Sequence, residues 1–128
     1  MRPSDRQRGS AAVEFALVLP IVLLILLALV QVAVLARDQL VLTQASRAAA
    51  REAAVDPSET AVEEAVRKAA VGLDGDRLGV EIVRTGTRGA PVTVALTYEV
   101  TIASVLTGWL FPESVMLRGT ATMRQEFG

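Results

Sequence analysis

The sequence contains no cysteine and no histidine, and aromatic residues make up only 4% of its 128 residues. Without cysteine the chain can form no disulfide framework and offers no thiolate. Without histidine it also lacks the usual general base near neutral pH, and the two absences together remove the commonest ligands of transition metals. We therefore expect no enzyme activity, no metal site and no cofactor.

An excess of one charge is also missing. The chain has 13 Lys and Arg residues against 14 Asp and Glu residues, a formal net charge of −1. This balance gives no electrostatic basis for binding nucleic acid. The charges are unevenly distributed, however, because residues 1–9 contain three arginines and one aspartate directly before an apolar run.

That apolar run extends from Phe15 to Ala36, 22 residues without a charge. As a helix it would measure about 33 Å, enough to cross a bilayer core of about 30 Å. The preceding arginines predict a cytoplasmic N terminus, with the chain beyond Arg37 on the other side. The sequence thus predicts a single-pass protein in contact with membrane lipid, divided into a cytoplasmic basic leader (1–9), a transmembrane helix (10–36) and an exported domain (37–128).

A secretory signal peptide is the alternative to a permanent anchor. The small residues in Val34-Leu35-Ala36 would offer a cleavage point for such a signal. The apolar core of a signal peptide spans roughly 7–15 residues, however, and the run here is longer. The length of the run favours an anchor.

Beyond the span, good helix formers continue to Val55, and two faces can be distinguished. One face carries small apolar residues, namely Leu42, Ala45, Ala49 and Ala53. The other face is polar and carries Arg37, Gln44, Arg47 and Arg51. Asp56 as N-cap, Pro57 at the first helical position and Gly72 at the end predict a second helix over 57–71.

Three later segments alternate between apolar and polar residues, which is typical of half-buried strands. They are residues 80–85, 92–102 and 115–125, and a short Gly-containing connection joins the first two as a hairpin. The predicted fold class is therefore α+β. A three-stranded antiparallel meander would cover the alanine face of the long helix.

Other motifs have mostly structural explanations. Asp74-Gly75-Asp76 lacks the further ligands of a calcium loop and is interpreted as a turn. The acids at 63 and 64 stand three to four residues before Arg67 and Lys68, which predicts surface ion pairs on the second helix.

Trp109, Leu110 and Phe111 fall in a predicted connection and not in a strand. Two interpretations stay open. They cap the open end of a small core, which we favour, or they form a contact for a partner subunit.

Glu14 places a carboxylate at the edge of the apolar run, where an acid is costly and is interpreted as functional by default. Either its side chain reaches the cytoplasmic headgroups, or it pairs with a positively charged group of a neighbouring chain.

The segment "RGSAAVEFALVLP" (8–20) resembles the N terminus of class III signal-peptide proteins, the type IV pilins and pseudopilins. It is most similar to the TadE-like family of the tight-adherence (Flp) pilus. The resemblance continues through the span into "ASRAAAREAA" (45–54) and the strand ending in "TATMRQE" (120–126).

This resemblance implies a pilin-like fold and a set of residue roles. Gly9 would be the last leader residue, cut by a prepilin peptidase, and Ser10 would become the new N terminus. Glu14 would be the fifth mature residue and, with Phe15, would take part in processing and assembly. The sequence departs from the conventional pilin pattern because Ser10 stands where phenylalanine is usual.

The resemblance predicts a minor pseudopilin in the cytoplasmic (inner) membrane that helps to assemble an adhesive, type IVb-like pilus. Its partners would be the peptidase, other pilins or pseudopilins and the secretion machinery. The alternative is an unprocessed, single-span envelope protein whose outer domain binds a ligand or partner.

Overall fold

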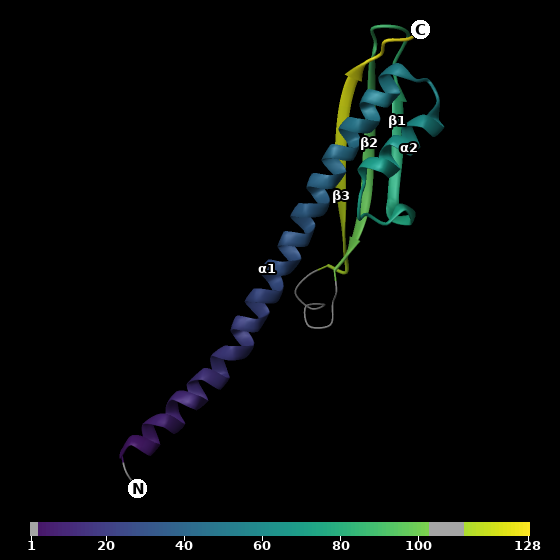
Figure 1. Ribbon diagram of the computed structural model, residues 1–128. Helices are drawn as coiled ribbons and strands as arrows, with labels where there is room; N and C mark the ends of the chain where they lie inside the picture. The colour runs from purple at the N-terminus through teal and green to yellow at the C-terminus, as the bar shows by residue number, and fades with distance from the viewer. Residues whose placement is uncertain (1–2, 103–111) are drawn as a thin grey trace. The chain divides into compact units, whose positions relative to one another are not determined.

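The protein is described by a computed structural model that covers the backbone of residues 3–102 and 112–128, with side chains from Gly9 onward in those ranges. In chain order its elements are α1 (Pro3–Val55), α2 (Glu59–Ala69), the short 3-10 helix η1 (Gly75–Arg77), β1 (Leu78–Arg84), β2 (Pro91–Thr101) and β3 (Ser114–Arg124) (Figure 1). The chain divides into two compact units, residues 1–34 and 35–128.

The first unit consists of the N-terminal part of α1. Large apolar side chains cover this part of the helix, and most are exposed, for example Phe15 at 67% and Leu23 at 56%. Pro20 lies inside the helix without ending it. Within the described residues, α1 is the one helix long and apolar enough to cross a membrane, and its most apolar stretch buries nothing.

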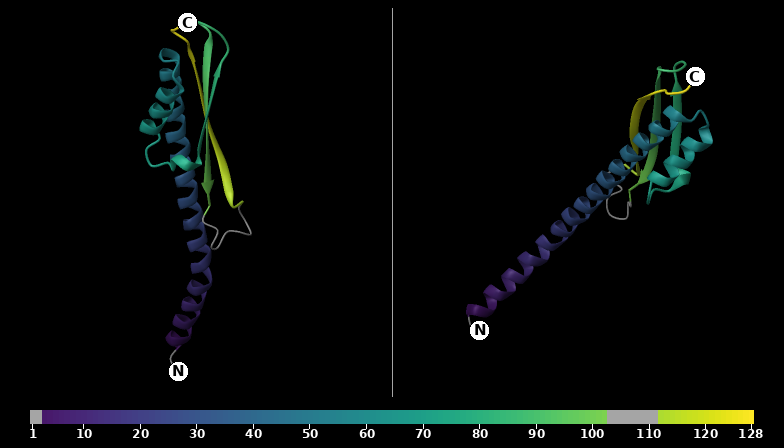
Figure 2. Two further views of the ribbon diagram at one scale, coloured as in Figure 1. Left: turned by 90° about the vertical axis from the view of Figure 1, so that its right-hand side faces the viewer. Right: turned by 45° about the horizontal axis from the view of Figure 1, so that its top comes forward.

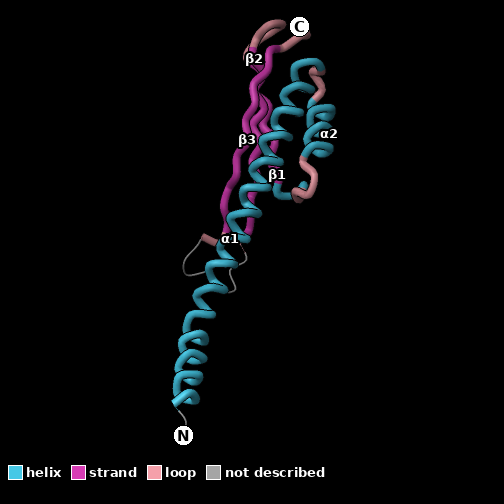
Figure 3. The backbone as a smooth tube through the Cα atoms, turned by 60° about the vertical axis from the view of Figure 1, so that its left-hand side comes forward, coloured by secondary structure: helices cyan, strands magenta, loops and turns pink. Residues whose placement is uncertain are grey.

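The second unit contains a three-stranded sheet, drawn in magenta in Figure 3. Its strand order is β1-β2-β3, and both pairs are antiparallel. The register places Val94 of β2 opposite Ile82 of β1 and Ala121 of β3. The predicted hairpin and meander are confirmed. The strand bounds differ from the predicted ones by two residues or fewer.

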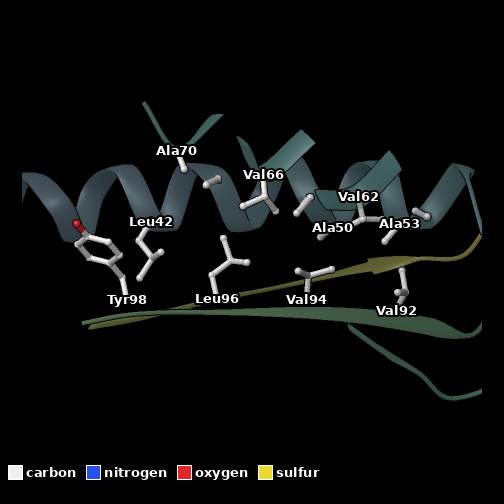
Figure 4. Packing of buried hydrophobic residues seen from close by; sticks show 13 residues of the cluster. Leu42, Ala50, Ala53, Val62, Val66, Ala70, Val92, Val94, Leu96 and Tyr98 are labelled. Carbon is white, nitrogen blue, oxygen red and sulfur yellow. The ribbon is translucent and has the colours of Figure 1, made fainter. Parts of the chain in front are cut away.

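The C-terminal part of α1 and the shorter α2 lie on the same face of this sheet, in two layers (Figures 2 and 4). The predicted alanine face of α1 is buried, and it meets the inward side chains of β2. α2 adds two valines to the same core. The fully buried members of these three groups are Leu42, Ala45, Ala49 and Ala53; Val92, Val94 and Leu96; and Val62 and Val66.

Small residues at the contact let the helix and the sheet approach closely. A Cβ added to Gly119 of β3 would lie 2.9 Å from the carbonyl oxygen of Leu42 and 3.1 Å from its carbonyl carbon. Close by, the Gln39 side chain donates a hydrogen bond to the Arg118 carbonyl oxygen at 2.9 Å. Gly119 therefore occupies a position where the α1 backbone leaves no room for a side chain.

The predicted start of the second helix was wrong by two residues. α2 begins at Glu59 with Ser58 at its N-cap, and Pro57 precedes the helix. Asp56 does not cap the helix, because its Oδ1 accepts a hydrogen bond from the Ser58 N–H at 2.7 Å and so forms a local turn.

The predicted end of the second helix was also too late. α2 ends at Ala69, with Ala70 as its C-cap. Gly72 adopts φ +82°, the left-handed conformation that a glycine favours, but it does so three residues after the last helical residue. It therefore shapes the turn that leads into η1.

Candidate functional site

The segment that carries the predicted cleavage site belongs to the N-terminal unit and is helical throughout. Gly9 and Ser10 are both exposed. Apart from the adjacent helix backbone, no described atom lies within 4 Å of the position that a Cβ on Gly9 would take. The Gly9–Ser10 peptide bond is therefore reached from outside without displacing another part of the described structure.

The helix brings Ser10 and Glu14 together. The Ser10 hydroxyl donates a hydrogen bond to Glu14 Oε1 at 3.1 Å, a contact between residues four apart. Residues at this spacing lie one above the other on a helix surface. The contact was not predicted, because a spacing of four residues places the two side chains on one helix face without fixing the rotamers that join them.

Glu14 stands at a boundary between polar and apolar surface. Phe15 follows it and is largely exposed, and exposed apolar residues continue along the helix beyond Phe15. The carboxylate and the Ser10 hydroxyl thus form one polar site at the start of an otherwise apolar helix surface. Such a site suits an N–H donor or a positive charge that arrives from outside the helix.

Trp109, Leu110 and Phe111 lie outside the described residues, so their two interpretations stay open. The connection that carries them starts and ends at a hydrogen-bonded pair, in which the Ile102 N–H donates to the Glu113 carbonyl oxygen at 3.0 Å. Ile102 is itself buried. The end of β2 and the start of β3 are therefore joined by a hydrogen bond.

The acidic motifs of the domain have structural roles. Asp74 Oδ1 accepts a hydrogen bond from the Asp76 N–H at 3.1 Å, which fixes the turn at η1 as predicted. The part of the chain that the structure describes contains no group of three or more His, Cys, Asp or Glu side chains arranged to hold a metal ion.

The predicted ion pair on α2 is present between Glu64 and Lys68, with Nζ and Oε1 2.9 Å apart. The hydrogen bond from Lys68, together with its positive charge, lowers the pKa of Glu64, and the same contact raises the pKa of Lys68. Both side chains are exposed, so the pair supports the helix without forming an acid and base site.

Sequence reasoning also missed a buried acid at the beginning of the domain. Asp38 is only 6% exposed, and its Oδ1 lies 3.0 Å from Arg37 Nη1. It belongs to α1, between the apolar run and the alanine face. Its burial follows from the packing of the domain, which the local sequence pattern does not reveal.

A long apolar helix followed by a small α+β domain defines the general class of this protein, since that helix fits a single-pass membrane anchor. Residues 9–51 match the model of a protein family described as TadE-like protein. The match bears out, over these residues, the resemblance of the sequence to the TadE-like family. It lies wholly within α1 and includes Gly9, Ser10, Glu14 and Phe15.

The family match indicates a protein associated with the tight-adherence pilus, in a family that is structural rather than catalytic. A comparison with curated proteins found no match, and a comparison with solved structures found none either.

Proposed function

We propose that the protein is a minor pseudopilin that helps to assemble a tight-adherence (Flp, type IVb-like) pilus. It is anchored in the inner membrane with residues 1–9 in the cytoplasm and residues 37–128 outside, and a prepilin peptidase cuts it after Gly9. The observation that carries this proposal is the Ser10–Glu14 pair at the start of an exposed apolar helix, inside the segment that matches the TadE-like family.

Cleavage after Gly9 requires the helix to open locally, because α1 is helical on both sides of the bond. A protease groove accepts an extended chain. Glycine inside a helix weakens it by about 1 kcal/mol relative to alanine. Gly9 therefore lowers the free-energy cost of opening α1 at the proposed cleavage site.

Removal of residues 1–9 would leave an ammonium group on Ser10, one helical turn from Glu14. In a neighbouring subunit shifted along the helix axis, the same ammonium would approach Glu14 from outside. Opposite charges attract much more strongly in a low-dielectric medium than in water. The Ser10 hydroxyl bond would meanwhile hold the Glu14 carboxylate in a fixed direction.

The first test is the mass of the mature N terminus, measured on protein extracted from membranes that contain an active prepilin peptidase. We expect a chain beginning at Ser10. Matched samples are the same chain without the peptidase, and Gly9→Val with it, both of which should keep residues 1–9. An intact leader on the unaltered chain would contradict the proposal and favour the unprocessed envelope protein.

The second test replaces Glu14. Glu14→Ala should leave membrane insertion unchanged and reduce the number of assembled pili, because the partner ammonium loses its counter-charge. Val13→Ala is the matched control, since it changes the adjacent residue without changing a charge. Normal pilus numbers in Glu14→Ala would mean that the carboxylate only reaches the headgroups and takes no part in assembly.

A further inference from the structure

Gln31 is the only polar side chain between Phe15 and Ala36. It is partly exposed on α1, and no described residue forms a hydrogen bond with its side chain. An amide carries two N–H donors and a carbonyl acceptor, and hydrocarbon offers no partner for either. A helix placed in a membrane therefore leaves this amide with an unmet demand for hydrogen bonds.

Gln31 lies too deep in the predicted span for its amide to form hydrogen bonds with the lipid headgroups. Gln31 precedes Arg37, the first charge after the span, by six residues, or roughly 9 Å along a helix. It follows Phe15 by 16 residues, or about 24 Å. Lysine and arginine can reach the interface from such a depth because their side chains are long and flexible, whereas the glutamine side chain is shorter.

The residues around Gln31 form a continuous face suited to a second helix. From Leu17 the positions advance in steps of three and four residues, the spacing that keeps one seam of a helix against a partner helix. The members of this face, here called the Gln31 face, are Leu17, Ile21, Leu24, Ala28 and Gln31. Ala28, one turn before Gln31, is small and allows a partner backbone to come close.

The Gln31 face has no partner among the described residues. Leu17, Ile21 and Leu24 are exposed, and the most apolar window of the helix buries nothing. The face is thus available for packing against another transmembrane helix.

We propose that the Gln31 face pairs with the same face of a second copy of this chain, with the two Gln31 amides hydrogen-bonded to each other. A second copy fits because an amide both donates and accepts, so it complements itself. Two copies inserted in the same direction also hold Gln31 at the same depth. A helix without a polar side chain at that depth would leave the amide unpaired.

The absence of native cysteine allows a direct test by cross-linking of the full-length chain in membranes. Leu24→Cys and Ala28→Cys place a thiol on the Gln31 face, and Leu26→Cys places one on the opposite side of the helix. On oxidation we expect abundant disulfide-linked dimer from the first two and little from Leu26→Cys. Equal cross-linking at all three positions would overturn the proposal, and so would products containing only another protein.

A second pair of variants tests whether the Gln31 amide itself contributes to the dimer. Adding Gln31→Leu to Ala28→Cys should reduce the linked dimer roughly threefold to twentyfold, as expected for one interhelical side-chain hydrogen bond. Adding Val30→Leu instead is the matched control and should change little. An unchanged yield with Gln31→Leu would show that the amide makes no such contact. The measurement needs neither pili nor the peptidase, so its outcome is separate from that of the cleavage and assembly tests.

Discussion

The two parts of α1 differ in the size of their apolar side chains and in whether these side chains are buried. From Phe15 to Val34 the helix carries leucine, isoleucine and valine, and most of these large side chains are exposed. From Leu42 to Ala54 it carries mainly alanine, and five alanines of this stretch are buried. The residues with the most apolar surface are therefore the ones that the folded chain leaves uncovered.

Burial of a helix residue therefore depends on the surroundings of the helix and not on hydrophobicity alone. In the domain, the sheet must come close to the helix axis, so small side chains occupy the contact and β2 supplies the bulk. In the N-terminal part, a hydrocarbon environment would accept large aliphatic side chains without any covering element. Three predictions test how far the stability of the protein depends on buried contacts of this kind.

The largest effect is expected for Leu96→Ala. Leu96 is fully buried in β2 against α1, and truncation of a buried leucine costs about 2–5 kcal/mol. Leu23→Ala removes the same atoms from an exposed position, so it should leave the stability of the domain nearly unchanged. Hydrogen exchange of the β2 amides, measured on the full chain in detergent, reports the free energy of opening for both variants. Equal losses of opening free energy in Leu96→Ala and Leu23→Ala would contradict this prediction.

An intermediate effect is expected for Gly119→Val. The new Cβ would meet the Leu42 carbonyl group at 2.9–3.1 Å, and these backbone atoms cannot turn away as a flexible side chain can. Overpacking of this kind costs about 1–3 kcal/mol. Gly75→Ala provides the control, since no described atom lies within 4 Å of its added Cβ. The same exchange measurement should show faster opening of β3 only in Gly119→Val.

The smallest effect concerns the exposed pair Glu64–Lys68. Because Lys68 lowers the pKa of Glu64, the pair stabilises α2 fully above the ordinary glutamate pKa of 4.5. This stabilisation is lost as the pH falls through the lower pKa of Glu64 in the folded chain. Because Glu64 raises the pKa of Lys68 above its ordinary value of 10.5, the stabilisation is also lost as the pH rises through that raised pKa.

Glu64→Gln should therefore flatten the acid limb of the α2 stability profile, measured by amide exchange between pH 3 and pH 7. Glu63→Gln is a suitable control, because no ion pair of Glu63 is present among the described side chains. A larger change in Glu63→Gln than in Glu64→Gln would contradict the assignment. Added salt should weaken the effect of Glu64→Gln, as for any exposed ion pair.

Periodic patterns predicted most of this fold because they report directly on which faces are covered. Alternation identified β2, and the alanine spacing identified the buried face of α1. The start of α2 was missed because Asp56 can cap a helix or close a local turn, and only the path of the chain decides between them. Gly119 was missed as a packing residue because its significance depends on Leu42, which is remote in sequence.

At the candidate site, the residue types and their order were predictable, but one contact was not. Gly9, Glu14 and Phe15 stand out in the sequence because each interrupts or begins a pattern. The contact of the Ser10 hydroxyl could not be predicted, since serine is common and residue spacing does not determine its rotamer. Their roles in cleavage and assembly remain predictions that the experiments above address.

The contacts between α1 and the C-terminal strand also bear on how the domain reaches its folded state. The Gln39 side chain bonds to the Arg118 carbonyl across 79 residues of sequence, and the Glu126 N–H donates to the Ala54 carbonyl oxygen at 2.8 Å. Contacts between such distant residues slow folding, because a long loop must close before they form. α1 precedes β3 along the chain, so during synthesis these contacts form only after β3 has been made. A chain stalled before Arg118 would contain β2, which packs on the alanine face, but it would lack both of these hydrogen bonds to α1.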